Sequence, residues 1–340
     1  MPARQRILVT GGAGFIGSNF VRMVLTEQKD CFLVNLDKLT YAGNLENLEG
    51  FMNNANHKFV KGDICDGALV EKLIDEHKLE AIVNFAAESH VDRSLVDPGI
   101  FITTNVTGTL TLLKAALDKK VERFVQISTD EVYGSLGQEG LFTEATPVSP
   151  NSPYSASKAA ADHLVRAFGH SWGLKYNITR CSNNYGQYQF PEKMIPLMIN
   201  NALNDKDLPI YGDGLYVRDW LYVYDHCTAI WKVLTESEPG RIYNIGGNNE
   251  KTNLEVVRLI LKRLGKSESL IKHITDRPGH DRRYAIDSSR IMKTLSWRPS
   301  VTFEEGIAKT IDWYLANKKW LKNIVSGQYQ KYYETMYSGR

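Results

Sequence analysis

The chain has little cysteine and almost no surplus of charge. Its 340 residues include only four cysteines, Cys31, Cys65, Cys181 and Cys227, and none forms a Cys-x-x-Cys pair. Widely spaced thiols favour a reducing compartment, so we expect a cytoplasmic protein without a disulfide framework or a metal site. The 41 basic and 39 acidic residues give a net charge of +2. This balance gives no reason to expect nucleic acid or a membrane as a partner.

Long apolar runs are also scarce. The first residues, "MPARQRILVT", reach a strand-like run without the apolar core of a signal peptide, and no later stretch reads as a membrane span. We find no internal repeat, low-complexity tract or flexible linker. With 43% hydrophobic and 24% charged residues, the composition is typical of a globular protein with one large or two unequal domains.

The first half alternates short apolar runs with segments of helical spacing. The strand candidates are 6–10, 31–36, 57–60, 81–86, 123–128 and 175–180, and the helix candidates are 15–28, 66–78, 99–119 and 152–172. Nearly continuous apolar strands indicate a parallel sheet covered on both faces. The repeated strand–helix–strand units predict an α/β fold with a Rossmann-type, doubly wound parallel sheet.

The pattern changes after Cys181, where loop-rich and aromatic segments replace the regular alternation. We predict a first domain over residues 1–180, rejoined by about 219–258. Residues 181–340 are predicted as a smaller α/β domain that is discontinuous and interleaved with the first.

A glycine-rich stretch, "VTGGAGFIGS", joins the first strand to the first helix. Gly11 would allow a tight turn, Gly14 a close approach of the backbone to a pyrophosphate, and Gly17 close helix–sheet packing. The helix N-terminus adds free N–H groups and partial positive charge. The context predicts a dinucleotide site, although a tight turn alone would also explain the glycines.

Acidic residues follow the second and third strands. Asp37 lies where a carboxylate accepts hydrogen bonds from an adenosine ribose, which favours NAD over NADP. A helix cap is the alternative for Asp37, and Lys38 keeps NADP open. Asp63 and Ile64 are placed to flank the adenine, although an Asx turn would equally explain Asp63.

Tyr154 and Lys158 in "SPYSASK" are four residues apart, on one face of a predicted helix. A phenol is a poor base at neutral pH, but a nearby ammonium group and a nicotinamide cation would stabilise the phenolate. Tyr154 could then take a proton from a substrate hydroxyl. The surface of an amphipathic helix is the alternative explanation of this spacing.

Together, "TGGAGFIG", "STDEVYG" and "YSASK" resemble the extended short-chain dehydrogenase/reductase family. The resemblance continues through "FAAESHVDRS", "CSNNYGQYQFPEK", "LPIYGDG", "VRDWLYV" and "DRPGHDRRYAID", and is closest to its sugar-nucleotide 4,6-dehydratases. It implies a homodimeric lyase of deoxysugar biosynthesis that uses NAD and acts on a nucleoside-diphosphate sugar, with dTDP-glucose expected. UDP- or CDP-glucose dehydration, sugar-nucleotide 4-epimerisation and a non-catalytic sensor remain alternatives.

The resemblance also implies catalytic roles. Tyr154 would be the base for oxidation at C4, with Thr129 bonded to the C4 oxygen. Asp130 would protonate the departing C6 hydroxyl, and Glu131 would remove the C5 proton. Neighbouring carboxyls titrate as a coupled pair, and the sequence leaves open which one holds the proton. A solvated loop with a helix-capping role is the alternative for the two carboxylates.

The remaining contacts are carried over residue by residue. The expected cofactor contacts are Gly11, Gly14, Phe15, Ile16, Gly17, Asp37, Lys38, Leu39, Thr40, Asp63, Ile64, Ala86, Ala87, Thr104, Tyr154, Lys158 and Asn184. The expected substrate contacts are Ser89, Thr129, Asn183, Lys193, Met194, Pro209, Ile210, Tyr211, Arg218, Asn253 and His280.

For three of the expected substrate contacts, the chemistry of the side chain also suggests a role. Arg218 suits a diphosphate, and Tyr211 offers a flat face to a pyrimidine. A salt-bridge cluster is the alternative for His280. Two helices, near 100–118 and 153–170, are candidates for pairing across a two-fold axis, although packing inside one chain would give the same apolar stripes.

Overall fold

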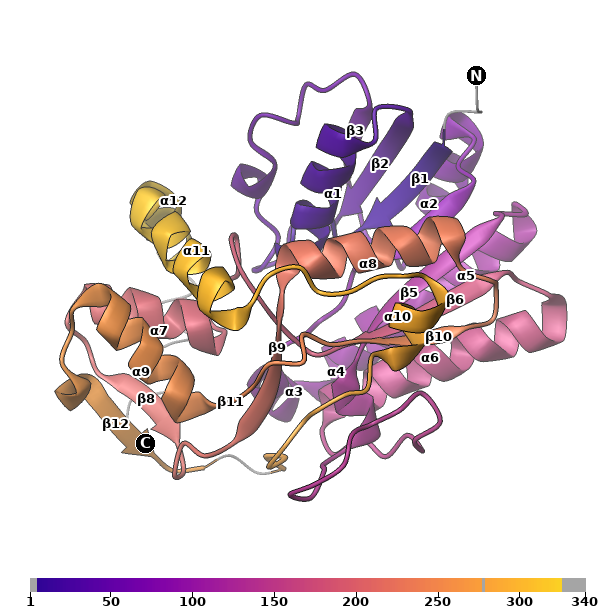
Figure 1. The fold of residues 1–340 in the computed structure, drawn as a ribbon. Coiled ribbons are helices and arrows are strands. Elements are labelled where there is room, and N and C mark those ends of the chain that lie inside the picture. Colours follow the sequence, from indigo (N-terminus) through magenta and orange to yellow (C-terminus); the bar gives the residue numbers. More distant parts are fainter. Residues whose placement is uncertain (1–4, 277–278, 326–340) are drawn as a thin grey trace.

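The computed structural model describes residues 5–276 and 279–325, and a seven-stranded parallel sheet forms its centre (Figure 1). The strand order is β3-β2-β1-β4-β5-β6-β10. The bounds are β1 (Gln5–Thr10), β2 (Cys31–Asp37), β3 (His57–Lys61), β4 (Ala81–Asn84), β5 (Arg123–Thr129), β6 (Tyr176–Cys181) and β10 (Ile242–Ile245). The first six strands lie on the predicted runs, and the doubly wound, Rossmann-type sheet is confirmed.

Helices cover both faces of this sheet. Helices α1 (Phe15–Glu27) and α8 (Val223–Glu236) pack over one face, and α2 (Gly67–His77), α5 (Thr109–Asp118) and α6 (Pro153–Trp172) over the other. Leu8 and Val9 are neighbours in β1 but belong to opposite cores, because side chains alternate across a strand. Two apolar layers therefore explain why the strands are apolar almost throughout.

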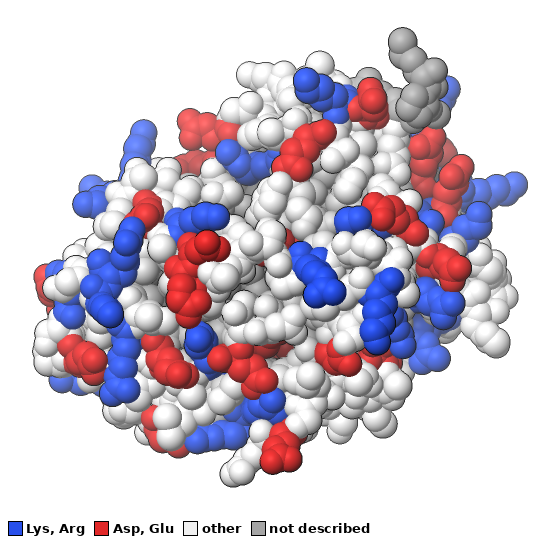
Figure 2. Space-filling view, in the orientation of Figure 1, with Lys and Arg blue, Asp and Glu red and all other residues white. Residues whose placement is uncertain are grey.

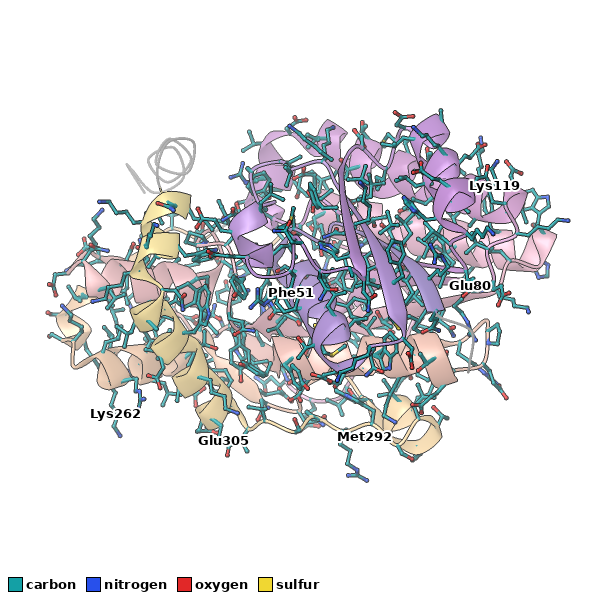
Figure 3. All side chains as sticks on the ribbon, turned by 90° about the horizontal axis from the view of Figure 1, so that it is seen from above. Phe51, Glu80, Lys119, Lys262, Met292 and Glu305 are labelled. Atoms are coloured by element: carbon teal, nitrogen blue, oxygen red, sulfur yellow. The ribbon has the colours of Figure 1, made fainter. Side chains whose placement is uncertain are left out.

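A smaller part lies beside the sheet, as the view from above shows (Figure 3). It contains a three-stranded sheet and a two-stranded sheet, with their own apolar core. Its elements are β7 (Asn183–Tyr185), α7 (Met194–Leu203), β8 (Leu208–Tyr211), β9 (Val217–Tyr222), β11 (Glu250–Thr252), α9 (Asn253–Leu264), β12 (Ile271–Ile274), α11 (Phe303–Ala316) and α12 (Lys318–Ile324). Short helices α3 (Val91–Val96), α4 (Pro98–Phe101) and α10 (Ser289–Thr294) are the remaining α-helices of the described residues.

The chain passes between the two parts more than once. Within the segment 219–258, α8 packs on α1 and β10 pairs with β6 of the large sheet, whereas β11 and α9 lie in the smaller part. The exact domain boundaries remain a prediction.

One helical stretch departs from the expectation that no segment is long and apolar enough to cross a membrane. By length and composition alone, Pro98–Asp118 meets that criterion among the described residues. It packs against α2 and α6, and Leu112, Leu113 and Ala116 are buried in the core under the sheet. The core helix of a soluble protein passes the same test.

The same burial bears on the predicted pairing of two helices across a two-fold axis. Packing inside the chain accounts for much of the apolar stripe on α5, while Ile100 and Ile102 remain exposed just before it. On the face drawn in Figure 2, basic and acidic side chains are interspersed, in keeping with the net charge of +2.

Candidate active site

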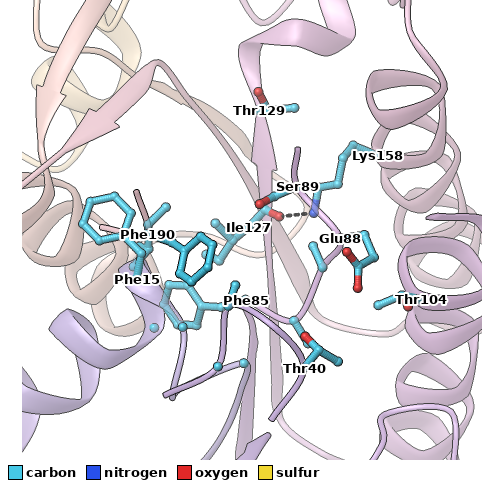
Figure 4. Close-up of a pocket in the computed structure, with 18 of the residues that line it drawn as sticks. Phe15, Thr40, Phe85, Glu88, Ser89, Thr104, Ile127, Thr129, Lys158 and Phe190 are labelled. Carbon is cyan, nitrogen blue, oxygen red and sulfur yellow. Dashed lines mark hydrogen bonds between the residues drawn. The ribbon is translucent and has the colours of Figure 1, made fainter. Parts of the chain in front are cut away.

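A cavity of about 300 Å³ opens at the carboxyl ends of β1, β4, β5 and β6 (Figure 4). Its walls come from the glycine loop, residues 85–89, the end of β5, the start of α6 and residues 181–193. Strand order reverses between β1 and β4, and ligands of open α/β sheets bind at such a switch point.

The glycine loop leaves room for backbone to approach backbone. Gly11 has φ +69°, and a Cβ there would lie 2.7 Å from the Ala86 nitrogen. Helix α1 starts after Gly14, which caps it without a side-chain hydrogen bond, and its first turn has no acidic residue. The first N–H groups of α1 therefore remain available to an anion, which fits the pyrophosphate of a dinucleotide.

Asp37 connects β2 to this loop. Its carboxylate accepts hydrogen bonds from the backbone nitrogens of Ala13, at 2.9 Å, and Leu39, at 2.7 Å. Burial raises the pKa of Asp37, and these two backbone bonds oppose the shift. Asp37 lines the cavity, whereas Leu39 does not. Since a carboxylate has about four acceptor sites, Asp37 keeps acceptor capacity for a ribose.

The neighbouring Lys38 and Asp63 form an ion pair of 2.7 Å. Asp63 also accepts a hydrogen bond from the Cys65 nitrogen at 2.9 Å, which is the Asx turn considered as its alternative explanation. Both residues line the cavity. Asp63 therefore both forms the structural turn and lines the cavity.

The adjacent carboxyls Asp130 and Glu131 open a 3₁₀ turn, Asp130–Tyr133, directly after β5. Thr129 caps this turn by accepting a hydrogen bond from the Glu131 nitrogen at 3.2 Å, and its hydroxyl donates to Asp130 Oδ1 at 3.3 Å. All three residues line the cavity. Asp130 is only 2% exposed, so the solvated-loop alternative does not apply to it.

The surroundings of Asp130 favour its neutral form. Burial raises its pKa well above the usual range, and the carboxylates of Glu131 and Asp219 raise it further, against an opposing effect of Arg218. Among the described residues its Oδ2 has no hydrogen-bond partner. Asp219 is fixed nearby by hydrogen bonds from the nitrogens of Gly247, at 3.1 Å, and Asn249, at 2.7 Å. Burial of Asp130 beside two other carboxylates therefore favours its protonated form.

Tyr154 and Lys158 lie one turn apart near the start of α6, which Ser152 begins with a capping box. The Lys158 ammonium donates to the Ile127 carbonyl at 2.7 Å (Figure 4). Burial raises the pKa of Tyr154 well above 10, the charge of Glu131 adds to this, and a hydrogen bond with Thr129 opposes it. Tyr154 thus needs nearby positive charge to act as a base at neutral pH.

The opposite wall is largely apolar, and sequence reasoning missed much of it. Phe85 and Phe190 line the cavity and lie with Phe15 on the side away from Lys158 (Figure 4). Glu192 lines it as well, and its carboxylate accepts hydrogen bonds from the Tyr41 hydroxyl, at 3.1 Å, and from Arg93, at 2.8 Å. Phe190 and Glu192 stand inside the quoted "CSNNYGQYQFPEK", which was the available signal.

A widened helix turn forms part of the same wall. Residues Ile102–Gly108 are π-helical, and Thr104 within it and Ile100 before it line the cavity. The Asn105 side chain donates to the Glu88 carbonyl, at 3.0 Å, and to the Ser157 hydroxyl, at 2.8 Å, and it accepts from the Glu88 nitrogen at 2.9 Å. Asn105 therefore joins the segment after β4 to helix α6.

The cavity brings together most of the residues predicted from sequence. It is lined by all five predicted catalytic residues, by every predicted cofactor contact except Leu39, and by the predicted substrate contacts Ser89, Thr129, Asn183 and Lys193. The other predicted substrate contacts lie outside its lining: Met194, Pro209, Ile210, Tyr211, Arg218, Asn253 and His280.

Three of these outer residues gather around Tyr216 in the smaller part. The ring of His280 stacks on that of Tyr216 at 3.7 Å, Tyr211 meets His280 edge-on at 5.9 Å, and the Arg218 guanidinium lies 6.0 Å from the Tyr216 ring. His280 also pairs with Asp276 at 2.7 Å, so its salt-bridge alternative is present. Within the described ranges, no group of His, Cys, Asp and Glu is arranged to hold a metal ion.

The fold and the cavity define the class of protein: a Rossmann-fold dinucleotide-binding protein of the extended short-chain dehydrogenase/reductase type. Within that class, the chain belongs to the GDP-mannose 4,6-dehydratase family, whose family model matches residues 8–310.

Individual relatives narrow the comparison. The chain is 57% identical over 341 residues to a dTDP-glucose 4,6-dehydratase of Xanthomonas campestris pv. campestris (strain B100), covering 95% of this chain and 97% of the relative. A crystal structure of a Streptomyces venezuelae dTDP-glucose 4,6-dehydratase with NAD and TDP bound has a TM-score of 0.92 at 48% identity, covering 94% of this chain and 100% of that one. A UDP-glucose 4-epimerase of Thermus thermophilus in complex with NAD has a TM-score of 0.85 at 33% identity, covering 92% and 100%.

Proposed function

We propose that this chain is an NAD-dependent hydro-lyase that converts dTDP-glucose to dTDP-4-keto-6-deoxyglucose and water, a step of deoxysugar-nucleotide biosynthesis. The relatives named above as dTDP-glucose 4,6-dehydratases support this substrate. One observation carries the chemistry: the buried Asp130, whose pKa is raised by its burial, lines the same cavity as Glu131, Tyr154 and the glycine loop.

NAD is the cofactor that the site fits. Gly11, Gly14 and the N-terminus of α1 would hold its pyrophosphate, and Asp37 would accept hydrogen bonds from its adenosine ribose. When bound, NAD takes up hydride from the sugar C4 and returns it to C6. A 2′-phosphate would lie close to the carboxylate of Asp37, which favours NAD over NADP.

The side chains at the end of β5 and the start of α6 divide the proton transfers. Tyr154 removes the proton of the C4 hydroxyl, and Thr129 hydrogen-bonds to the C4 oxygen. The C4 ketone then acidifies the C5 proton, so that a carboxylate of ordinary basicity, Glu131, removes it. Asp130 gives its proton to the departing C6 hydroxyl, which leaves as water, and a proton then returns to C5 from Glu131 as hydride adds to C6. Adjacent carboxyls in different environments suit these opposite roles.

The residues outside the cavity lining are proposed to bind the nucleotide. Arg218 offers a planar, permanently charged donor set for the diphosphate, and Tyr211 offers a ring face for the base. UDP- and CDP-glucose remain as alternative substrates, because the three nucleotides differ only by a methyl group, a 2′-hydroxyl or an amide edge.

A sugar-nucleotide 4-epimerase is the second candidate, since the epimerase named above shares the fold. An epimerase performs no elimination and does not need a neutral acid beside a carboxylate base. The arrangement of Asp130 and Glu131 therefore favours the dehydratase. A sensor without turnover would need neither group.

Incubation of the protein with dTDP-glucose tests the proposal. We expect a 4-keto-6-deoxy sugar, detected by its alkali-dependent absorbance and by mass, with no net consumption of NAD. Parallel reactions with UDP-glucose, CDP-glucose and GDP-mannose rank the nucleotides. Recovery of a 4-epimer, or of unaltered sugar in all four reactions, would refute dehydration.

We propose the cytoplasm as the setting, because all four cysteines are free thiols and a reducing compartment keeps them so. We also propose a homodimer, with the exposed Ile100 and Ile102 before α5 contributing to its interface.

A further inference from the structure

Three buried ionisable side chains form a cluster that begins at the wall of the cavity, where Lys158 lies. Lys158 and Asp162 are one turn apart on α6, and Arg180 of β6 donates to Asp162 Oδ2 at 2.9 Å. The paired side chains of Arg180 and Asp162 are only 3% and 1% exposed, and Lys158 is 4% exposed. Asp162 Oδ1 has no hydrogen-bond partner among the described residues.

The cluster contains two basic groups and one acidic group. The Asp162 carboxylate pairs with the Arg180 guanidinium and lies one helical turn from Lys158, and all three side chains are buried. Arg180 is further held over the Tyr133 ring at 4.8 Å, and Tyr133 donates to Asn244 at 2.7 Å. Because a guanidinium stays charged in proteins, the loss of the carboxylate would leave Lys158 as the cation that gives up its charge.

We propose that Asp162 is a positioning residue that keeps Lys158 charged beside Tyr154, so that Tyr154 can act as the base in C4 oxidation. The role rests on the function proposed above, because Lys158 matters to the reaction through the Tyr154 phenolate. Asp162 does not line the cavity and is expected to touch neither sugar nor cofactor.

The surroundings of Lys158 agree with this role. Burial lowers the pKa of Lys158, and the charges of Asp162 and Cys181 oppose the shift, Asp162 more strongly. Burial also raises the pKa of the Cys181 thiol, so Cys181 contributes no charge at neutral pH. Titratable or charged groups reach this region from α6, β6 and the turn after β5: Tyr154, Asp162, Arg180, Cys181, Asp130 and Glu131. Of these, Asp162 is the anion on the helix face that carries Lys158.

The test compares Asp162→Asn with Asp162→Glu. Asp162→Asn should let Lys158 lose its proton at lower pH, which removes support for the phenolate and raises the pKa of Tyr154. The pH below which kcat falls should rise by about one unit. At pH values below that point, kcat of Asp162→Asn should be about tenfold lower than that of the unmodified protein. The KM for dTDP-glucose should stay unchanged, and Asp162→Glu should restore most of kcat. Asp312→Asn, which removes the carboxylate from an exposed pair with Arg263, is the matched control and should have no effect.

A second measurement does not depend on turnover. NMR of ¹⁵N- and ¹³C-labelled lysine follows the charge of the Lys158 side chain through pH, with Lys158→Met identifying its signal. In the unmodified protein we expect Lys158 to be charged at neutral pH, and in Asp162→Asn to titrate at lower pH. A neutral Lys158 in the unmodified protein, or identical pH profiles for it and Asp162→Asn, would overturn the proposal. A protein that makes no keto sugar but shows the expected lysine titrations would instead refute the proposed function alone.

Discussion

Replacement of Asp130 by Asn separates the burial of this side chain from its capacity to donate a proton. An amide has nearly the shape of a protonated carboxyl and can still accept the hydrogen bond that the Thr129 hydroxyl donates at 3.3 Å. It cannot donate a proton to a leaving group. We therefore expect Asp130→Asn to fold and to oxidise C4, but to release water slowly.

The magnitude follows from the role of a general acid. Loss of such a group costs about 10²–10⁴-fold in the step that it serves. The elimination should slow by that factor, while the reduced cofactor builds up in the first turnover and is seen by its absorbance. Rapid mixing with dTDP-glucose measures the two phases separately.

The difference in stability between the unmodified protein and Asp130→Asn should change with pH, to the disadvantage of the unmodified protein as pH rises. Because burial raises the folded-state pKa of Asp130, this carboxyl favours folding below its ordinary pKa, and the advantage is lost as pH rises toward the folded value. The unmodified protein should therefore lose stability relative to Asp130→Asn by at most about 1.4 kcal/mol for each pH unit in that window. Urea denaturation at several pH values between 4 and 8 measures the difference.

Asp312→Asn serves as the control, because Asp312 is exposed. The difference in unfolding free energy between this variant and the unmodified protein should be nearly constant over the same pH range. Parallel stability profiles for Asp130→Asn and the unmodified protein would show that Asp130 is not held neutral. Full dehydratase turnover by Asp130→Asn would show that another group supplies the proton.

Three further substitutions test other parts of the site and surface. Glu131→Gln should block exchange of the C5 proton with solvent while C4 oxidation remains measurable; unchanged turnover would favour the epimerase. Gly11→Ala should weaken NAD binding by calorimetry, because its Cβ would lie 2.7 Å from the Ala86 nitrogen at a φ of +69°; equal affinity would contradict the close approach. Ile102→Lys, on a side chain that is 51% exposed, should shift a dimer toward monomer in light scattering without loss of thermal stability; an unchanged mass would place the interface elsewhere.

The sequence predicts the parts of this fold that local patterns control. Short apolar runs locate six of the seven strands of the large sheet, and the glycine spacing locates the turn into α1, because both depend on neighbours in the chain. The seventh strand, β10, falls within the segment of about 219–258 that is predicted to rejoin the first domain, and it pairs with β6. The same segment also supplies β11 and α9 to the smaller part, so the bounds of the return depend on packing between distant elements.

The same distinction applies to the cavity. Motif residues at strand ends, such as Thr129 and Asp37, line it because the sheet fixes where strand ends point. Phe85 contributes only apolar surface to the lining, and its residue type alone does not distinguish a ligand contact from a core residue. Arg218 lies outside the lining and donates to the carbonyls of Val217 and Asp281, an orientation set by contacts across the smaller part.

The shape of the cavity depends on the π-helical turn at Ile102–Gly108, which is a local irregularity in one helix. Because a π-helical hydrogen bond spans five residues and an α-helical one spans four, deletion of a single residue there would give a regular α-helix whose flanking segments keep nearly the same direction. The side chains of the turn itself, with Thr104 and Asn105 among them, would shift while the sheet, the glycine turn and both carboxyls stayed in place. A deletion in this turn would therefore reshape the wall of the ligand site without replacing any of the catalytic side chains.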